Sequence, residues 1–528
     1  MAQYKNIPAD GLAGLKEFYK TDAISGFIVF LLALPLSLGI AKASEFPPLM
    51  GLITAIIGGL VVSLLMGSRL TIKGPAAGLI VIVAGAVNEF GGGEKGWHLA
   101  LGAIVVAGVI QVLFGVLKFG RLVDFFPISA IHGMLAAIGL IIIAKQIPVL
   151  LDIDPAMTKG LGPLGLFAKI PEFFTHFNPK ATAIGIGSLA IMLGWPYVKN
   201  KYLKIIPAPL IVLFVAIPAD LIIDFQISEP KNAIVHVGNL LNNIRVNVDF
   251  SGIAQTGIFL KYVIMFALVG TLESLLTVKA IDMMDPYKRK SNANKDIIAI
   301  GVGNTLAGIL GGLPMISEVA RSSANVTNGA KTRWANFFHG FFILVFVLLA
   351  SDLIELIPNA ALAAMLITVG IRLAHPKEFI NMFRIGKEQS FVFLSTIFFT
   401  LYEDLLVGIA VGIVLKMIIH LLNGAPISSF FKAHAMVSFE GNECLIEINK
   451  VAIFSNFLGI KRKLDEIPVG FKVTIDLKNA TLVDHSVMES LSRFKYDYEA
   501  IDGGKVNILG LDELHPFSKH KLAARKKK

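Results

Sequence analysis

The sequence has little charge and almost no cysteine. Only 16% of its 528 residues are charged, against about a quarter in an ordinary soluble chain, and its mean hydropathy is +0.70. The single cysteine, Cys444, excludes a disulfide within the chain. The sequence offers no nucleophile–base pair, metal-ligand cluster or nucleotide-binding loop, so an enzyme is the least favoured class. These features predict a membrane protein without a resident cofactor, a bound Na⁺ being the one exception considered below.

The net charge of +10 is spread over short loops and termini. Lys16 and Lys20 precede the first apolar run, residues 288–290 lie between two later runs, and residues 525–528 end the chain. This is the distribution of cytoplasmic segments under the positive-inside rule. The basic residues therefore predict a protein of the plasma (inner) membrane with these segments in the cytoplasm. They do not indicate a nucleic-acid partner.

Apolar runs of about 20 residues, enough to cross a bilayer, fill the first four-fifths of the chain after a polar N-terminal segment, residues 1–22. Two further segments, 73–84 and 314–328, are interrupted by Gly and Pro and bring the expected total to fourteen. An even number places both basic termini in the cytoplasm. The uninterrupted spans are expected near 23–43, 48–66, 97–117, 128–147, 181–196, 205–223, 257–279, 296–311, 335–356, 358–374, 388–402 and 404–422.

The two halves of this transmembrane domain (23–423) resemble each other. Residues 34–43 can be laid over 271–280 at an offset of 237, and Pro75 lies over Pro314 at an offset of 239. Seven segments per repeat is an odd number, so the second copy, about 255–423, must be inverted relative to the first, about 23–224. Paired interrupted segments in such repeats indicate a transporter binding site. The alternative is chance similarity between apolar helices.

The composition changes after residue 423. A linker, 424–436, leads into a small α/β domain, 437–528, that ends in a basic tail. We expect strands at 451–457, 473–477 and 506–509, and an amphipathic helix at 486–494.

The interrupted segments predict an anion site. Pro75 and Pro314 each stand just before an expected helix start inside the membrane, where free N–H groups and the positive end of the helix dipole attract anions. The small residues Ala76, Ala77 and Gly78 allow close approach of the backbone. Alternatively, the Gly-Pro pairs only kink continuous helices.

Glu273 lies at the centre of an apolar span, where a carboxylate is costly and usually functional. Thr277 is four residues later, on the same helical face, and these oxygen ligands suit Na⁺. Burial would instead favour proton exchange at Glu273. A structural, hydrogen-bonded role is the third interpretation.

Glu318 and Arg321 open the second interrupted segment. They either pair as a structural clamp, or Glu318 contacts cation or substrate while Arg321 faces the mouth of the site. Lys73 either attracts anions or, more commonly for such a residue, marks an exposed helix edge. His132 and His420 are isolated in the sequence and are interpreted as packing or interface residues.

Five motifs within the expected membrane segments are residues 51–54, 67–77, 126–133 with Gln146, 312–325 and 404–412. They resemble the SulP (sulfate permease) family of anion transporters. Residues 473–477 and 483–486 are similar to the STAS domain that follows in that family, so the similarity covers nearly the whole chain.

The resemblance implies a 7+7 inverted repeat with core and gate domains, elevator-like motion, a homodimer and a small anion as substrate. Some bacterial members import bicarbonate with Na⁺, and their cation-binding acid and threonine correspond to Glu273 and Thr277. A regulatory partner at the STAS domain is also implied. The predicted substrate-binding residues are Ser37, Gly74, Pro75, Ala76, Ala77, Ile316, Ser317, Glu318 and Arg321.

Two residues depart from the family pattern, and a third matches a STAS residue whose neighbours differ. Glu318 replaces a small residue and resembles the second acid of related nucleobase transporters, and Lys73 replaces an apolar one. Ser486 aligns with the phosphoacceptor of bacterial STAS regulators, but its neighbours differ, which argues against phosphorylation.

The favoured function is secondary transport of bicarbonate or sulfate coupled to Na⁺ or H⁺ through Glu273. The alternatives are a proton-coupled carboxylate or nucleobase carrier, favoured by Glu318, and a non-transporting membrane scaffold or sensor.

Overall fold

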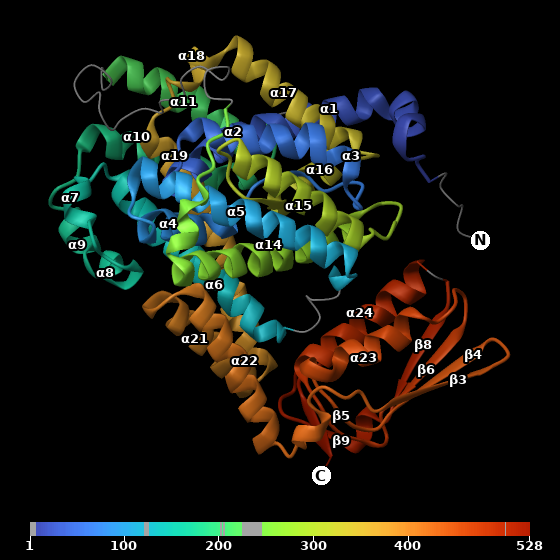
Figure 1. Ribbon diagram of the computed structural model, residues 1–528. Coiled ribbons are helices and arrows are strands. Elements are labelled where there is room, and N and C mark those ends of the chain that lie inside the picture. The colour runs from blue at the N-terminus through green and yellow to red at the C-terminus, as the bar shows by residue number, and fades with distance from the viewer. Residues whose placement is uncertain are drawn as a thin grey trace. The chain divides into compact units, whose positions relative to one another are not determined.

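The computed structural model describes residues 7–120, 126–200, 203, 206–223, 245–501 and 503–527. The first six residues, the expected end of repeat one at 224 and the last residue of the basic tail lie outside these ranges. The chain forms two compact units, one of residues 1–120 and 138–372, the other of 121–137 and 373–528. Figure 1 shows the helical part and the strand-containing part of the chain.

Every segment expected in the membrane contains a helix. Low charge and Leu, Ile, Val and Ala side chains favour this, because a helix satisfies its own backbone hydrogen bonds in lipid. The helices are α1 (Gly11–Ala43), α2 (Pro48–Ile57), α4 (Ile80–Glu89), α5 (Gly93–Val116), α6 (Ile128–Leu150), α10 (Pro179–Gly194), α11 (Ala208–Ile223), α14 (Thr256–Met284), α15 (Ala293–Ile309), α16 (Val319–Thr327), α17 (Trp334–Leu349), α19 (Asn359–Leu373), α21 (Lys387–Tyr402) and α22 (Leu405–Leu422).

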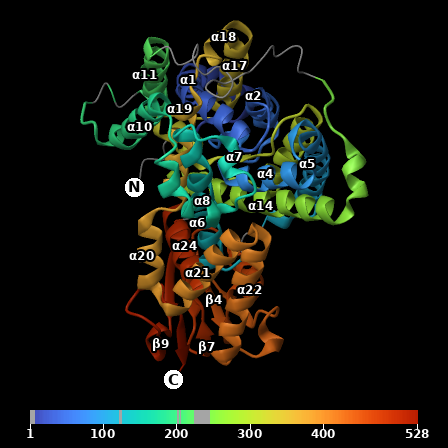
Figure 2. The same ribbon diagram turned by 90° about the vertical axis from the view of Figure 1, so that its left-hand side faces the viewer.

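Seven helical stretches among the described residues are long and apolar enough to cross a bilayer by length and composition, and three more are apolar but shorter. The protein is thus a polytopic helical membrane protein. The expected span 335–356 is divided, since α17 ends at Leu349 and a short helix, α18 (Ser351–Ile354), follows. Figure 1 shows α5 beside α15, and Figure 2 shows α10 beside α11.

The two interrupted segments pair with each other. Strand β1 (Lys73–Pro75) is antiparallel to β2 (Met315–Ser317), and the pairs are Lys73 with Ser317, Gly74 with Ile316 and Pro75 with Met315. The chain then enters a 3₁₀ turn (Ala77–Leu79) and α4 after β1, and α16 after β2. Antiparallel pairing of matching segments is what two inverted repeats produce around a two-fold axis.

The segments are not continuous kinked helices. Both prolines also lie further from the helices than expected. Pro75 is the last residue of β1, and Pro314 precedes β2, five residues before α16 begins at Val319. Extended backbone replaces helix here, and the paired strands share hydrogen bonds that a helix break would leave unmade.

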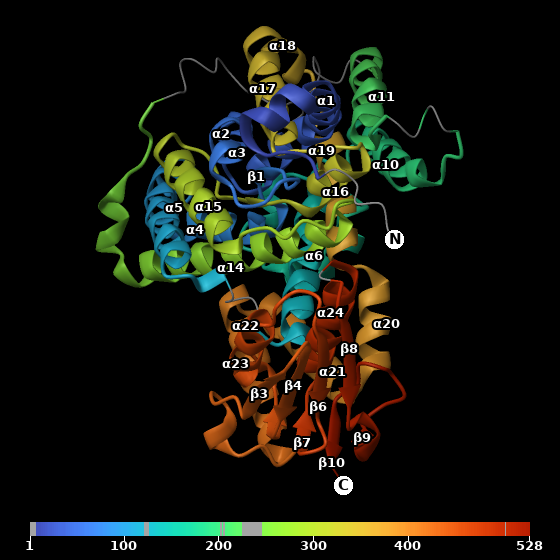
Figure 3. The ribbon, with the colours of Figure 1, turned by 90° about the vertical axis from the view of Figure 1, so that its right-hand side faces the viewer.

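The C-terminal region contains two four-stranded sheets and two helices (Figure 3). The strand order is β3-β4-β6-β8 in one sheet and β5-β7-β10-β9 in the other, an arrangement consistent with a STAS domain. The elements are β3 (Ala435–Glu440), β4 (Glu443–Ile448), β5 (Lys450–Ala452), α23 (Phe454–Asp465), β6 (Lys472–Asp476), β7 (Ala480–Val483), α24 (His485–Ile501), β8 (Lys505–Leu509), β9 (Leu514–Pro516) and β10 (Arg525–Lys527).

One strand of this domain was placed wrongly by the sequence. The expected strand at 451–457 ends at Ala452, and α23 begins at Phe454. The Asn456 side chain accepts a hydrogen bond from Ile453 N, and Phe454 N donates to Asp484, so this turn is capped as a helix start. A short apolar run cannot by itself distinguish strand from helix.

Within the second unit, the C-terminal domain contacts membrane helices. His420 Nε2 of α22 lies 3.4 Å from Asp484 Oδ2, and both side chains are buried. The backbone N–H of Ile128, the first residue of α6, donates to Ser486 Oγ at 3.2 Å. His132 Nδ1 lies 3.1 Å from Glu378 Oε2 in α20 (Pro376–Ile385). Neither histidine is isolated, which corrects that part of the sequence interpretation.

Candidate functional site

The paired strands β1 and β2 form a buried floor for the site. All six residues of the two strands are buried. Asn304 of α15 holds β2 by accepting a hydrogen bond from Met315 N at 2.6 Å, and its amide donates to Gln111 at 2.7 Å. Gln111 in turn donates to Thr271 of α14 at 3.3 Å. This chain of buried polar groups fixes β2 against α5, α14 and α15.

The 3₁₀ turn (Ala77–Leu79) together with α4 is the first half-helix of the site, and α16 is the second. The carboxylate of Glu273, a residue of α14, lies at the start of the first half-helix. Its residue is 6% exposed, and its carboxylate packs directly against Gly78 in the 3₁₀ turn before α4, so closely that a methyl group at Gly78 would collide with it. Glu273 Oε1 accepts no hydrogen bond from the described residues. The predicted close approach at Gly78 is thus present, and the group that approaches is the predicted coupling acid.

Thr277 lies one turn further along α14 and is also buried. The four-residue spacing keeps its side chain on the helical face of Glu273. These two residues bring one carboxylate and one hydroxyl to the same face, and the Na⁺ role predicted for them stays a prediction. Among the described residues there is no group of three or more His, Cys, Asp or Glu placed to hold a metal ion.

Arg321 is the largest fully buried side chain of the site. It lies on the first turn of α16, and its guanidinium packs against Gly74 of β1, where a Cβ atom would overlap it. None of its three guanidinium nitrogens has a hydrogen-bond partner among the described residues. A buried charge without such partners is costly, so the arrangement is suited to an anion that supplies the missing acceptors.

Glu318 is engaged at the N-terminus of α16. Its carboxylate accepts a hydrogen bond from Arg321 N at 2.7 Å and lies 4.0 Å from Arg321 Nε, with 16% of the side chain exposed. The negative charge caps a positive helix end. The Glu318 carboxylate thus binds the backbone of its own helix, and the roles that the sequence left open for Glu318 and Arg321 stay predictions.

The sequence missed a buried ion pair beside the strands. Lys73 is fully buried, and its Nζ lies 2.6 Å from Asp296 Oδ2 in the first turn of α15. The expectation of an exposed helix edge for Lys73 is therefore wrong, because the residue belongs to a paired strand in the interior. A single acid in an otherwise apolar span, as at Asp296, was the available signal.

The remaining predicted residues lie around the same strands. Pro75, Ala76, Ala77 and Ile316 are buried in or next to them. Ser317 N donates to Ser274 Oγ at 3.1 Å, which ties β2 to the residue after Glu273. The hydroxyl of Ser37 in α1 is buried and has no partner among the described residues. His339 of α17, which the sequence did not single out, is likewise buried with both ring nitrogens unpartnered there.

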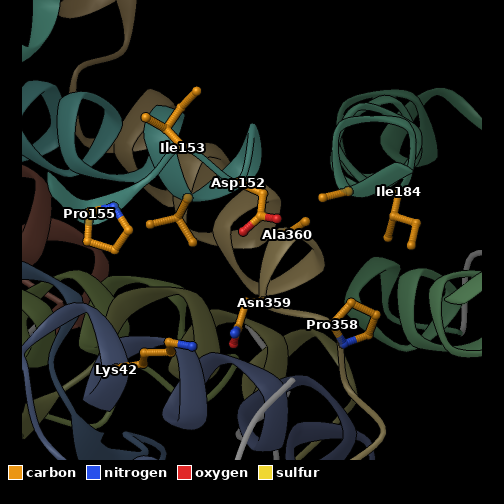
Figure 4. A pocket seen from close by; sticks show the side chains of 10 residues that line it. Lys42, Asp152, Ile153, Pro155, Ile184, Pro358, Asn359 and Ala360 are labelled. Carbon is orange, nitrogen blue, oxygen red and sulfur yellow. The ribbon is translucent and has the colours of Figure 1, made fainter. Parts of the chain in front are cut away.

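A separate cavity of about 150 Å³ lies elsewhere in the first unit (Figure 4). In that view Lys42 points toward Asn359, and Asp152 directs its carboxylate into the cavity. None of the predicted substrate-binding residues lines it. The buried cluster around β1 and β2 therefore remains the candidate site.

Comparison with known proteins places this chain among anion transporters. The model of the sulfate permease family matches residues 19–396. YvdB of Bacillus subtilis, provisionally named a sulfate transporter, is 28% identical over 409 residues, covering 76% of this chain and 74% of YvdB. The bicarbonate transporter BicA of a Picosynechococcus strain is 26% identical over 400 residues, covering 74% of this chain and 68% of BicA.

The fold has a counterpart among solved structures. The structure of SLC26A9 superposes with a TM-score of 0.69 over 94% of this chain and 85% of that chain, at 16% identity. At that identity the similarity speaks for the fold alone. The superposed range includes the strand-containing C-terminal region.

Proposed function

Because the chain belongs to the sulfate permease family, we propose that it is a secondary transporter of a small inorganic anion, with bicarbonate or sulfate as the preferred substrate. The relatives are transporters and not enzymes. The observation that carries the proposal is the buried guanidinium of Arg321, which packs against Gly74 of β1 and lacks hydrogen-bond acceptors among the described residues. An oxyanion would supply these acceptors.

Coupling to a cation follows from the balance of charges around the strands. Lys73 and Arg321 are positive, whereas Glu273, Glu318 and Asp296 are acidic. Glu318 and Asp296 each lie beside a positive partner, and Glu273 has none among the described residues. A proton or Na⁺ at Glu273 would remove the charge that otherwise repels an incoming anion, and Thr277 would add an oxygen ligand for Na⁺.

The same proposal includes the orientation and the mechanism of movement. The protein lies in the plasma membrane as a dimer with both termini in the cytoplasm, and elevator-like motion of the β1–β2 region gives alternating access. The C-terminal domain offers a surface for a regulatory partner.

The carboxylate or nucleobase alternative depended on Glu318 as a substrate ligand. Because that carboxylate caps α16, the geometry gives this alternative no added support. The scaffold alternative predicts no flux at all.

Uptake into proteoliposomes tests all three functions. Labelled bicarbonate, sulfate, chloride and fumarate are supplied with and without a Na⁺ gradient or a pH gradient. We expect cation-dependent uptake of bicarbonate or sulfate. Uptake of fumarate alone supports the carboxylate carrier, and absence of flux for every substrate supports the scaffold or the nucleobase carrier.

A further inference from the structure

The ammonium group of Lys73 is surrounded by oxygen atoms from three segments. Its Nζ lies 2.6 Å from Asp296 Oδ2 of α15, donates to Ser317 Oγ of β2 and reaches Ser68 Oγ at 3.4 Å. Lys73 itself is the first residue of β1 and is fully buried. A carboxylate with hydroxyl ligands is the set of oxygen donors that also holds small hard cations.

The surroundings orient this carboxylate toward the ammonium. Asp296 Oδ1 accepts hydrogen bonds from Ser68 N at 3.1 Å, Ser68 Oγ at 2.8 Å and Gly67 N at 3.2 Å. Oδ1 therefore binds the loop before β1, and Oδ2 contacts the ammonium and also accepts a hydrogen bond from Ser317 Oγ at 3.4 Å. Hydrogen bonds to a ligating carboxylate fix its orientation toward the ion.

The position of the ammonium connects both halves of the candidate site. Lys73 and Ser317 are partners in the β1–β2 pairing, and Ser274 Oγ donates to Ser317 Oγ at 2.9 Å. Ser274 follows Glu273 in α14. The ammonium thus links three elements. Lys73 belongs to β1, its ammonium contacts Ser317 of β2, and Ser317 contacts Ser274 of α14, the helix that carries Glu273.

We propose that the ammonium of Lys73 is a tethered cation, occupying a cation site formed by Asp296 Oδ2, Ser317 Oγ and Ser68 Oγ. The ammonium holds β1 and β2 in register. Because the ammonium fills the cation site at Asp296, that site needs no diffusible ion. Lys73 is a positioning residue, since it acts on the substrate region through Ser317. The inference deepens the proposed function, because it leaves Glu273 as the group that exchanges the coupling cation.

Removal of the tether tests the inference. In Lys73→Ala the oxygen ligands remain and the ammonium is lost, so the site should accept a free cation. The probes are ammonium, methylammonium, Na⁺ and K⁺ chlorides, with choline chloride to hold ionic strength constant. We expect uptake to fall about tenfold or more in choline, as for a buried pair that loses one partner. Ammonium or another small cation should restore uptake, and the restored rate should saturate as the cation concentration rises. The same cation should raise the melting temperature of the variant, because it binds the folded protein.

Matched variants separate this role from simple packing. Lys42→Ala removes a lysine at the separate cavity and should show no cation rescue. The neutral pair Lys73→Met/Asp296→Asn removes both charges while keeping bulk. We expect it to remain folded but to transport slowly, with no response to cations. Wild-type uptake by this double variant would overturn the inference, as would a folded Lys73→Ala that no cation restores or stabilises.

A folding defect does not prevent the test. If Lys73→Ala is recovered only as aggregate, membranes are prepared with and without each cation, and the yield of monodisperse protein is compared. A cation-dependent yield supports the tethered cation, and an unchanged yield overturns it. Melting temperature and yield do not depend on transport, so a wild-type protein without flux would contradict the proposed function while leaving this inference open to its own result.

Discussion

The carboxylate of Glu273 packs directly against the backbone of Gly78, at the start of the first half-helix. The acid comes from the second repeat and the glycine from the first. An acid at the positive end of a helix gains from the helix dipole when it is ionised, whereas burial favours its neutral form. Small changes in its surroundings can therefore decide which form prevails, as is required of a group that binds and releases a cation.

The contact with Gly78 predicts a strong effect of one methyl group. Gly78→Ala should reduce coupled uptake by about tenfold or more, since overpacking of a tight site shifts its backbone or side chains. Gly187→Ala is the matched control, because no atom lies within 4 Å of the added Cβ there. Uptake and gel filtration of both variants check the prediction, and equal activity of the two would contradict it.

The coupling role proposed for Glu273 predicts a specific loss. Glu273→Gln should abolish cation-dependent uptake while leaving the protein folded. The amide has the shape of the carboxyl group, but it carries no negative charge to attract Na⁺ and does not take up a proton near neutral pH. The measurement is uptake with and without each gradient, together with a melting curve. Retention of full cation-dependent uptake would refute this role.

The guanidinium of Arg321, which lacks hydrogen-bond acceptors among the described residues, predicts a change in anion affinity. Arg321→Met should raise KM by about 10- to 100-fold, the value of one hydrogen bond to a charged group. Arg321→Lys keeps the positive charge but lacks the planar guanidinium, so its KM should lie between that of the wild type and that of Arg321→Met. Initial rates over a range of anion concentrations give KM, and an unchanged KM in both variants would remove Arg321 from the binding site.

The cap at Glu318 predicts an effect on stability rather than on substrate choice. Glu318→Ala should lower the free energy of unfolding by about 1 kcal/mol, as other lost helix caps do. Glu318→Ser should retain most of it, since serine also caps helices. Thermal unfolding measures this, and the substrate panel provides the second readout. An altered pH profile or substrate preference in Glu318→Ser would restore the interpretation of Glu318 as a site residue.

The contact between His420 and Asp484 predicts a linkage between α22 and the C-terminal domain. Burial acts to raise the pKa of the Asp484 carboxyl, but His420, Lys416 and the N–H of Val487 outweigh it and hold this pKa below its usual value. The stabilisation from the carboxylate is therefore complete above the unfolded pKa of about 4 and is lost as the pH falls through the lowered pKa.

Asp484→Asn should accordingly destabilise the domain by about 2 kcal/mol at neutral pH, with increased proteolysis near residue 424. Asp476→Asn, at a partly exposed position of the same domain, serves as the control. Equal proteolysis of the two variants would show that the pair does not hold the domain.

Much of the membrane domain was predictable from sequence, because apolar runs in lipid have to form helices. The positions of Pro75 and Pro314 indicated the interrupted segments, and the small residue Gly78 indicated a close approach. The helix start at Phe454 was not predictable, since its cap depends on Asp484, thirty residues away. Lys73 was misplaced for a similar reason, because its partner Asp296 lies in another repeat.

The sequence alone thus determined the membrane class and the interrupted segments and singled out Glu273 as a candidate coupling residue, since each follows from the cost of charge or unpaired backbone in lipid. Only the tertiary structure decided which groups meet. It placed Glu273 against Gly78 and Arg321 against Gly74, assigned Glu318 to the cap of α16 and joined Lys73 to Asp296. The physical reason is that the antiparallel pairing of β1 and β2 brings together residues more than 200 positions apart, and this pairing determines which side chains surround the buried charges.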